Sequence, residues 1–126
     1  MNKYGNKKVT IDGEVFDSKR EAARYKELKL LERCGAISDL KRQVTYELIP
    51  TQKEESTKVY TKGRKKGQPI PGKTIERAVY YVADFTYVDS NTGTTVVEDT
   101  KGVRTKDYIM KRKLMLFRHR IKIQEV

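Results

Sequence analysis

Two acidic residues on neighbouring segments have the spacing of a metal-binding carboxylate pair. Asp84 lies in residues 79–88, which are rich in Val, Tyr, Phe and Thr, and Asp99 lies in residues 94–101, which are rich in Thr and Val. Both compositions are typical of strands, and residues 89–93 between them have the composition of a hairpin turn. If the numbers of the residues that face each other across the hairpin add up to 183, Asp84 lies opposite Asp99, roughly 5 Å away. Two opposed carboxylates repel each other unless a cation lies between them, and a divalent metal ion could fill that role.

A lysine two residues beyond Asp99 belongs to the same predicted site. Side chains alternate along a strand, so Lys101 shares the face of Asp99. A register sum of 182 would instead place Glu98 opposite Asp84, but it would turn Lys101 to the other side of the sheet. We favour Asp99 because the Asp-x-Lys spacing keeps both groups together, and Glu98 is the alternative.

The charge distribution supports a specialised role for this hairpin. Residues 79–100 contain four acids and no Lys or Arg, whereas at the density of the whole chain, 28 in 126, a segment of that length would carry about five. Solvated acids on an outer face would be the ordinary explanation. Both faces of residues 79–88 are largely apolar, however, as in a strand that is covered on both sides. An acid in such a strand indicates function.

A third carboxylate is expected on the first helix. Ser18 is a good N-cap, and the helix should run to about Cys34, where Gly35 offers a stop. The expected inward stripe of this helix includes Ala22, Tyr25, Leu28 and Leu31. Glu21 lies along the edge of that stripe. The spacing of Ser18 and Glu21 also matches a capping box, so Glu21 is either a cap partner or a ligand, and only the rest of the pattern favours the ligand.

The remaining segments complete one predicted domain over residues 1–126. Residues 9–16 have the pattern of a tight hairpin, residues 43–49 alternate as a strand, and residues 120–126 alternate as a last strand. A helix is expected from about Lys106 to Arg118, with its buried side formed by Ile109, Met110, Leu114 and Phe117. The predicted order is hairpin, helix, three strands, helix, strand. This order is typical of an α/β (α+β) sandwich with a mixed sheet and flanking helices.

Composition restricts the chemistry. Cys34 is the only cysteine and His119 the only histidine, so disulfide frameworks, thiolate zinc sites and Ser-His or Cys-His nucleophile pairs are excluded or nearly so. The net charge of +11 indicates a polyanionic partner, of which nucleic acid is the usual one. No apolar run approaches the length of a membrane span, so we expect a soluble intracellular protein.

A basic loop is expected at about residues 50–78. This segment contains all three prolines, three glycines and eight Lys or Arg against three Glu. We expect a long mobile loop that either is a solvated insertion or contacts backbone phosphates and orders on binding, and we favour the second. The predicted nucleic-acid-binding residues are Lys62, Arg64, Lys65 and Lys66 in this loop, and Lys111, Arg112 and Arg118 on the second helix.

The arrangement of Glu on the first helix, Asp on one strand and Asp-x-Lys on the next resembles the PD-(D/E)XK nuclease superfamily, whose fold is restriction-endonuclease-like. In particular, residues 16–21, 81–85 and 97–102 resemble the helix start, the Y-x-P-D-F strand and the V-E-T-K-G strand of phage junction-resolving enzymes of the endonuclease I type. The chain is also similar to a family of small phage proteins without an assigned function. Ala83 stands where the superfamily has proline, and Asp99 where glutamate is commoner. The resemblance spans roughly residues 9–125 and leaves the basic loop unmatched.

The resemblance implies a metal-dependent endonuclease of the Holliday-junction-resolving type that hydrolyses DNA to 5′-phosphate ends. The residues themselves leave a four-way junction, a flap, an ordinary duplex and RNA open as substrates. Oxygen-only ligands suit Mg²⁺ or Mn²⁺, and the candidate donors are Glu21, Asp84, Asp99 and the Thr100 carbonyl. Lys101 would orient the attacking water and stabilise charge on the phosphate.

A two-fold symmetric junction needs paired cuts, so the family implies a homodimer. It also implies a phage protein in the cytoplasm of its bacterial host. The alternative is a non-catalytic nucleic-acid-binding or regulatory phage protein on the same fold.

Overall fold

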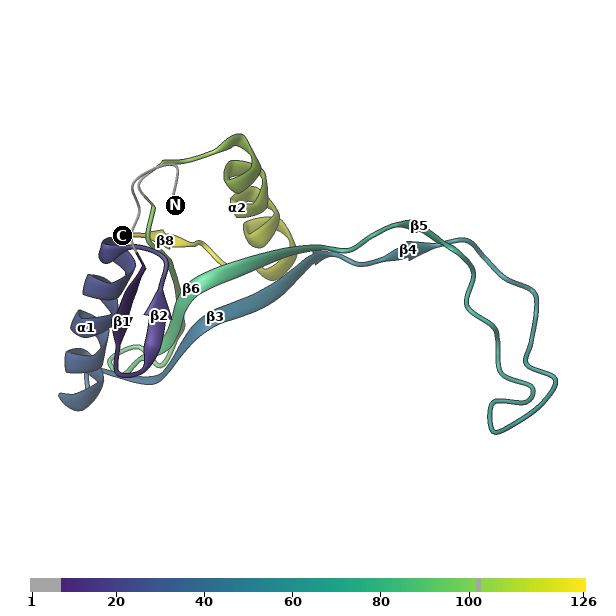
Figure 1. Ribbon diagram of the computed structural model, residues 1–126, viewed down its shortest axis with the longest axis horizontal. Coiled ribbons are helices and arrows are strands. Elements are labelled where there is room, and N and C mark those ends of the chain that lie inside the picture. The colour runs from purple at the N-terminus through teal and green to yellow at the C-terminus, as the bar shows by residue number, and fades with distance from the viewer. Residues whose placement is uncertain (1–7, 102) are drawn as a thin grey trace.

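The computed structural model describes residues 8–101 and 103–126. It has an α+β fold in which two helices flank a sheet, and a long two-stranded arm projects from this body (Figure 1). The elements are β1 (Val9–Ile11), β2 (Glu14–Phe16), α1 (Lys19–Arg33), β3 (Ile37–Ile49), β4 (Gln52–Lys53), β5 (Thr74–Glu76), β6 (Val79–Asp89), β7 (Thr95–Asp99), α2 (Lys106–His119) and β8 (Gln124–Glu125).

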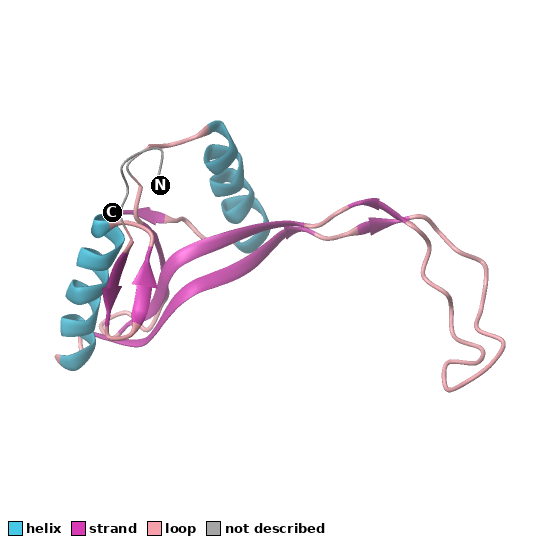
Figure 2. Cartoon of the chain, viewed as in Figure 1, coloured by secondary structure: helices cyan, strands magenta, loops and turns pink. Residues whose placement is uncertain are grey.

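The main sheet is mixed, as predicted. Its strand order is β3-β6-β7-β8, with antiparallel pairs up to β7 and a parallel pair between β7 and β8 (Figure 2). The sequence prediction placed the start of β3 six residues too late, at position 43, and extended the last strand beyond the two residues of β8. The element order of the body otherwise matches the prediction.

The hairpin that carries the two aspartates has the predicted register. Phe85 faces Glu98 and Val88 faces Thr95, so the facing positions sum to 183. The turn is closed by the amide of Gly93, which donates to the carbonyl of Asp89 at 2.7 Å. Gly93 has a φ of +72°, a conformation in which glycine carries no steric penalty.

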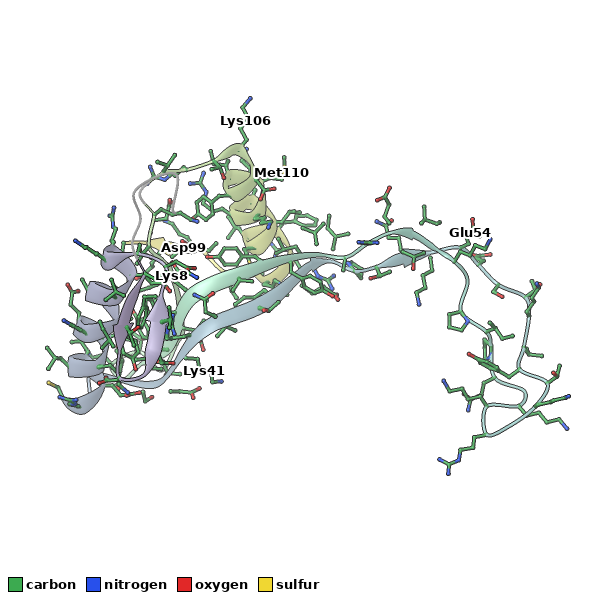
Figure 3. The ribbon with its side chains drawn as sticks, viewed as in Figure 1. Lys8, Lys41, Glu54, Asp99, Lys106 and Met110 are labelled. Carbon is green, nitrogen blue, oxygen red and sulfur yellow. The ribbon has the colours of Figure 1, made fainter. Side chains whose placement is uncertain are left out.

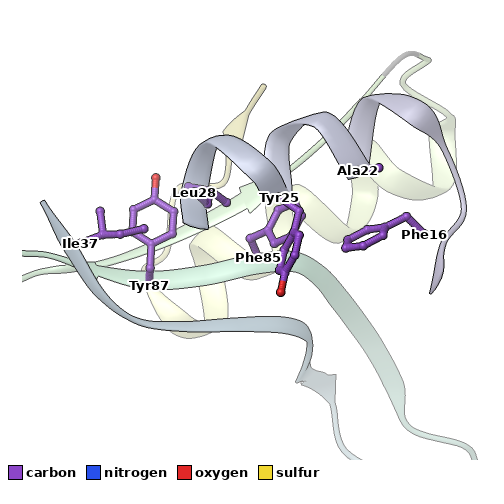
Figure 4. Close-up of a cluster of buried hydrophobic side chains, with 7 residues drawn as sticks. All are labelled: Phe16, Ala22, Tyr25, Leu28, Ile37, Phe85 and Tyr87. Carbon is purple, nitrogen blue, oxygen red and sulfur yellow. The ribbon is translucent and has the colours of Figure 1, made fainter. Parts of the chain in front are cut away.

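Two apolar clusters fix the helices on the sheet. Helix α1 and the β1–β2 hairpin pack on one part of the sheet through Phe16, Ala22, Tyr25, Leu28, Ile37, Phe85 and Tyr87 (Figure 4). Helix α2 packs on another part through Leu48, Tyr81, Ala83, Val97, Tyr108, Met115 and Ile123. The two clusters meet along β6 and β7, so the strands that carry Asp84 and Asp99 run between them.

The predicted inward faces of the helices need correction. On α2, Met110 and Phe117 are 59% and 77% exposed, whereas Tyr108 and Met115 are buried. The residues of each pair are seven positions apart, so each pair lies along one face of the helix. The two pairs are offset by two positions, which is about 200° around a helix, so they lie on opposite faces and the prediction chose the wrong one. On α1, Leu31 is exposed as well, while the other three residues of the predicted stripe are buried.

The segment at about 50–78, predicted as a long mobile loop, lies mostly outside strands, but its two sides are paired at several points. It contains the short β4–β5 pair and an isolated bridge between Val59 and Pro69. Further out, the amide of Tyr60 donates to the carbonyl of Gln68 at 3.0 Å. We call residues 50–78 the arm, and it extends β3 and β6 away from the body (Figure 1).

Helix length and polarity bear on membrane insertion. Within the described residues, neither helix is long and apolar enough to cross a membrane.

Candidate functional site

Asp99 is held at the end of β7 by two neighbours. The side chain is buried, and its Oδ2 accepts a hydrogen bond of 2.5 Å from the Tyr81 hydroxyl. Its Oδ1 lies 3.3 Å from Nζ of Lys101, so these two residues share a face as the sequence predicted. The Lys101 ammonium also lies 4.3 Å from the ring centre of Tyr108 on α2. Asp99, labelled in Figure 3, therefore lies beside a positioned cation, the Lys101 ammonium.

Asp84 is fixed by the residue that follows Asp99. Its Oδ2 accepts hydrogen bonds from the backbone amide of Thr100 at 2.8 Å and from the Thr100 hydroxyl at 2.7 Å. No donor among the described residues reaches Oδ1 of Asp84. Thr100 was predicted as a carbonyl ligand, and here its amide and hydroxyl orient a neighbouring carboxylate.

Electrostatic coupling links the three predicted carboxylates. Burial raises the pKa of Asp99, and the charge of Asp84 raises it further, against the lowering effects of the Tyr81 hydrogen bond and Lys101. Burial is also the main cause that raises the pKa of Glu21, and Asp84 is the next. Asp99 and Glu21 are thus harder to ionise because they are buried and because Asp84 lies near them, and a bound cation would offset both effects.

Glu21 is buried in the first turn of α1, and its side chain is not used in the helix cap. Ser18 caps the helix as predicted, because its hydroxyl accepts from the Glu21 amide at 3.1 Å. The Glu21 carboxylate instead accepts from Nε2 of Gln43 at 3.0 Å and from Nη2 of Arg42 at 3.4 Å. Gln43 has a φ of +51°, a strained backbone for a non-glycine residue in a strand, and such strain clusters at functional sites.

Glu98 belongs to a different network. It is fully buried, and both of its oxygens are bound by Arg24, with distances of 2.8 Å from Nε and 2.6 Å from Nη2. The Tyr87 hydroxyl also donates to Glu98. Its partner in the register is Phe85, whereas the next position, Asp99, contacts Lys101. This geometry agrees with the choice of Asp99 over Glu98 for the site.

The predicted metal ligands are oxygen donors, which suits a hard cation such as Mg²⁺. Over residues 8–101 and 103–126, however, no three His, Cys, Asp or Glu side chains gather closely enough to hold a metal ion. The physical reason lies in Glu21, which is turned towards Arg42 and Gln43. Asp84 and Asp99 are therefore the pair whose donor chemistry and mutual repulsion fit a cation, and a metal ion bound by them stays a prediction.

The seven predicted nucleic-acid-binding residues do not form one surface. Lys62, Arg64, Lys65 and Lys66 lie near the far end of the arm, whereas the other three lie on α2 (Figure 1). Those three have acidic neighbours within the chain. The distances are 3.5 Å for Lys111–Asp107, 3.2 Å for Arg112–Glu125 and 3.5 Å for Arg118–Glu47.

Sequence reasoning missed the residues that hold the carboxylates. Tyr81 and Arg42 act through long side chains whose direction depends on the twist of the sheet, so no spacing rule points to them. Arg24 had a detectable signal, because it lies three residues after Glu21 at the edge of the apolar stripe of α1. An arginine in that position can pair with a buried acid, and Glu98 is that acid.

The chain belongs to the family described as "Protein of unknown function (DUF1064)", whose match covers residues 1–125. No curated protein and no solved structure matches the chain.

Proposed function

We propose that this protein is a metal-dependent endonuclease that hydrolyses phosphodiester bonds in DNA, built on the plan of the PD-(D/E)XK nucleases. One observation carries the proposal. Asp84 and Asp99 lie on adjacent positions of a central hairpin, and the Lys101 ammonium lies 3.3 Å from Asp99. A buried acid whose pKa is raised, as that of Asp99 is, beside a lysine is typical of catalytic sites.

In this proposal, different residues of the chain bind the metal ion, position its ligands and stabilise the reacting phosphate. Asp84, Asp99 and the Thr100 carbonyl would hold Mg²⁺ or Mn²⁺, which activates water and neutralises phosphate charge when it is bound. Glu21 would join them by turning its carboxylate from Arg42 and Gln43 to the ion. Tyr81 fixes one oxygen of Asp99, and Thr100 fixes one oxygen of Asp84. Lys101 would orient the attacking water and stabilise negative charge on the reacting phosphate.

DNA is the proposed substrate because of charge. The net charge of +11 and the basic end of the arm suit a polyanion, and phosphate contacts supply most of the affinity in such complexes. The resemblance to phage junction-resolving enzymes supports a branched substrate, a homodimer and a place in the bacterial host cytoplasm. Since a two-fold junction needs two cuts, the dimer would supply one carboxylate site for each strand.

A substrate panel tests the proposal. Purified protein is incubated with Mg²⁺ or with EDTA and with a four-way junction, a flap, a linear duplex and a duplex RNA of matched length. We expect Mg²⁺-dependent cleavage that is fastest on the junction, with 5′-phosphate ends. Binding to all substrates without cleavage of any would favour the non-catalytic alternative. Paired incisions, and a dimeric mass with and without DNA, would support the homodimer, whereas single nicks by a monomer would refute it.

A further inference from the structure

The far end of the arm carries basic charge that the chain does not neutralise. We call residues 58–68 the arm tip. It has no acidic residue, and its five basic residues are all exposed: Lys58, Lys62, Arg64, Lys65 and Lys66. In the part of the chain that the structure describes, none of the five forms a salt bridge. The three basic residues of α2 with acidic neighbours differ in this respect. The arm tip therefore gathers five cations without a salt-bridge partner into eleven consecutive residues of the described chain.

The arm that carries this tip is cross-linked along its length. The amide of Glu54 donates to the carbonyl of Lys73 at 2.8 Å, and the amide of Ile70 donates to the carbonyl of Lys58 at 2.9 Å. A Cβ on Gly72 would collide with the carbonyl oxygen of Glu54, so the two strands approach more closely there than any side chain allows. The arm is a two-stranded ribbon at β4–β5, and beyond it the chain widens into a loop whose tip stands well away from the body (Figures 1 and 3).

The arm contributes no side chain to the hydrophobic core. Neither apolar cluster contains a residue from the arm, and its large apolar side chains Val59 and Ile75 are 48% and 60% exposed. A ribbon that contributes no burial but concentrates unpaired charge at its end is suited to contact a partner.

We propose that the arm is a duplex-binding ribbon that lies in the major groove of DNA beyond the cleavage site, so that the substrate must carry a double-stranded flank. The major groove, about 12 Å wide, admits a two-stranded β-ribbon, and the basic tip can contact phosphates on both of its walls. Single strands are a poorer fit, because Tyr60 is the only aromatic residue in the arm and stacking on aromatic rings dominates single-strand binding. The location of the flank relative to the cut rests on the proposed nuclease function, whereas duplex binding by the arm does not.

The length of the arm sets the expected length of the flank. Roughly 20 residues separate Arg64 from Asp84, and at about 3.3 Å per residue they span at most about 65 Å. The bend of the arm in Figure 1 shortens this reach. With about 3.4 Å per base pair along B-DNA, the tip would contact the duplex roughly 10–18 base pairs from the reacting phosphate.

The test measures binding in EDTA, where no cleavage occurs. Four-way junctions with arms of 6–30 base pairs are titrated with the wild-type chain and with a variant in which Asn-Gly replaces residues 55–72, a turn that closes a two-residue hairpin. We expect wild-type affinity to rise until the DNA arms reach about 18 base pairs, and the variant to reach its plateau at shorter arms. Hydroxyl-radical footprints should show wild-type protection 10–18 base pairs from the crossover that the variant loses. Identical length dependence and footprints for the two proteins would overturn the proposal.

A second pair of variants keeps the arm intact. The first changes Lys62, Arg64, Lys65 and Lys66 to Gln, and the control changes Lys19, Lys26, Arg33 and Lys122 to Gln, four exposed basic residues of the body. Loss of four phosphate contacts should weaken duplex binding at least about tenfold in the tip variant, against less than about threefold in the control. Equal losses would show that only net charge matters and would contradict the arm proposal. If the shortened variant cleaves DNA and gives the same footprint as the wild type, the proposed role of the arm is refuted and the nuclease function is not. If the wild type does not cleave DNA, the nuclease function is refuted and duplex binding by the arm is not.

Discussion

Asp99 occupies a buried position where its negative charge is unfavourable even with the Lys101 ammonium beside it. Burial and the charge of Asp84 raise its pKa, so the folded protein holds the proton more tightly than the unfolded chain does. The resulting loss of stability is absent below the ordinary aspartate pKa of about 3.9, and it grows as the pH rises through the higher pKa of the folded state. Asp99→Asn removes this unfavourable charge.

The variant Asp99→Asn should therefore melt roughly 3–6 °C above the wild type in EDTA at pH 8, the shift that about 1 kcal/mol produces in a domain of this size. The difference should disappear near pH 3.5, because both proteins are then neutral at this position. Differential scanning calorimetry across this pH range measures it. A lower melting temperature for the variant at pH 8 would mean that the pair with Lys101 outweighs the burial of the charge.

Substitution of Glu98 should lower the stability of the protein, the opposite of the effect expected for Asp99. Glu98→Gln leaves the Arg24 guanidinium beside a neutral group in a buried setting, where loss of a charged hydrogen-bond partner costs about 1–3 kcal/mol. Urea unfolding should show this loss of stability, while Mg²⁺-dependent cleavage per folded molecule stays close to that of the wild type. Loss of cleavage in a folded Glu98→Gln protein would instead place Glu98 in the reacting site.

At the residue scale, the facing of Asp84 and Asp99 was predictable because strand alternation and turn length together set the register of a hairpin. The contacts of Glu21 were not. Its backbone takes part in the cap that the motif predicted, but its side chain reaches Gln43 on β3. That contact depends on a left-handed residue inside a strand, a conformation that no sequence pattern at residues 37–49 indicates.

At the element scale, the arm should be separable from the folding of the body. Because no arm residue enters either apolar cluster, replacement of residues 55–72 by Asn-Gly removes no core packing. Shortening a connection lowers its closure entropy cost by only about 0.6 kcal/mol per halving of length. The melting temperature of the shortened protein should therefore equal that of the wild type or exceed it by a few degrees. A drop of more than about 5 °C would show that the arm stabilises the body.

The arm and α2 also show where sequence reasoning stopped. The arm was predicted as a loop because neither of its faces is buried, so its strands lack the apolar alternation that identifies strands elsewhere. On α2, two apolar pairs with the same spacing competed for the inward face. Packing against Leu48 and Tyr81, from distant parts of the chain, selects Tyr108 and Met115, and local periodicity contains no information about that contact.

For the whole molecule, the mixed α+β architecture followed from element order, while the distribution of charge followed only from the structure. With about six phosphate contacts, the logarithm of the association constant should fall against the logarithm of salt concentration with a slope near −5. Changing the four arm residues Lys62, Arg64, Lys65 and Lys66 to Gln should reduce that slope to about −2 without moving the bond that is cut. Fluorescence anisotropy across a salt series measures the slope, and an unchanged slope would place the phosphate contacts elsewhere on the protein.

The most direct test of the nuclease assignment compares three proteins on one supercoiled plasmid. Wild type, Asp99→Asn and Glu98→Gln are each incubated with Mg²⁺ and with EDTA, after circular dichroism has shown that all three are folded. We predict nicking by the wild type and by Glu98→Gln in Mg²⁺ only, and a loss of at least about 100-fold in Asp99→Asn despite its higher stability. Full nicking activity in Asp99→Asn, or metal-independent nicking by all three proteins, would contradict the assignment of the Asp84–Asp99 pair as the catalytic centre.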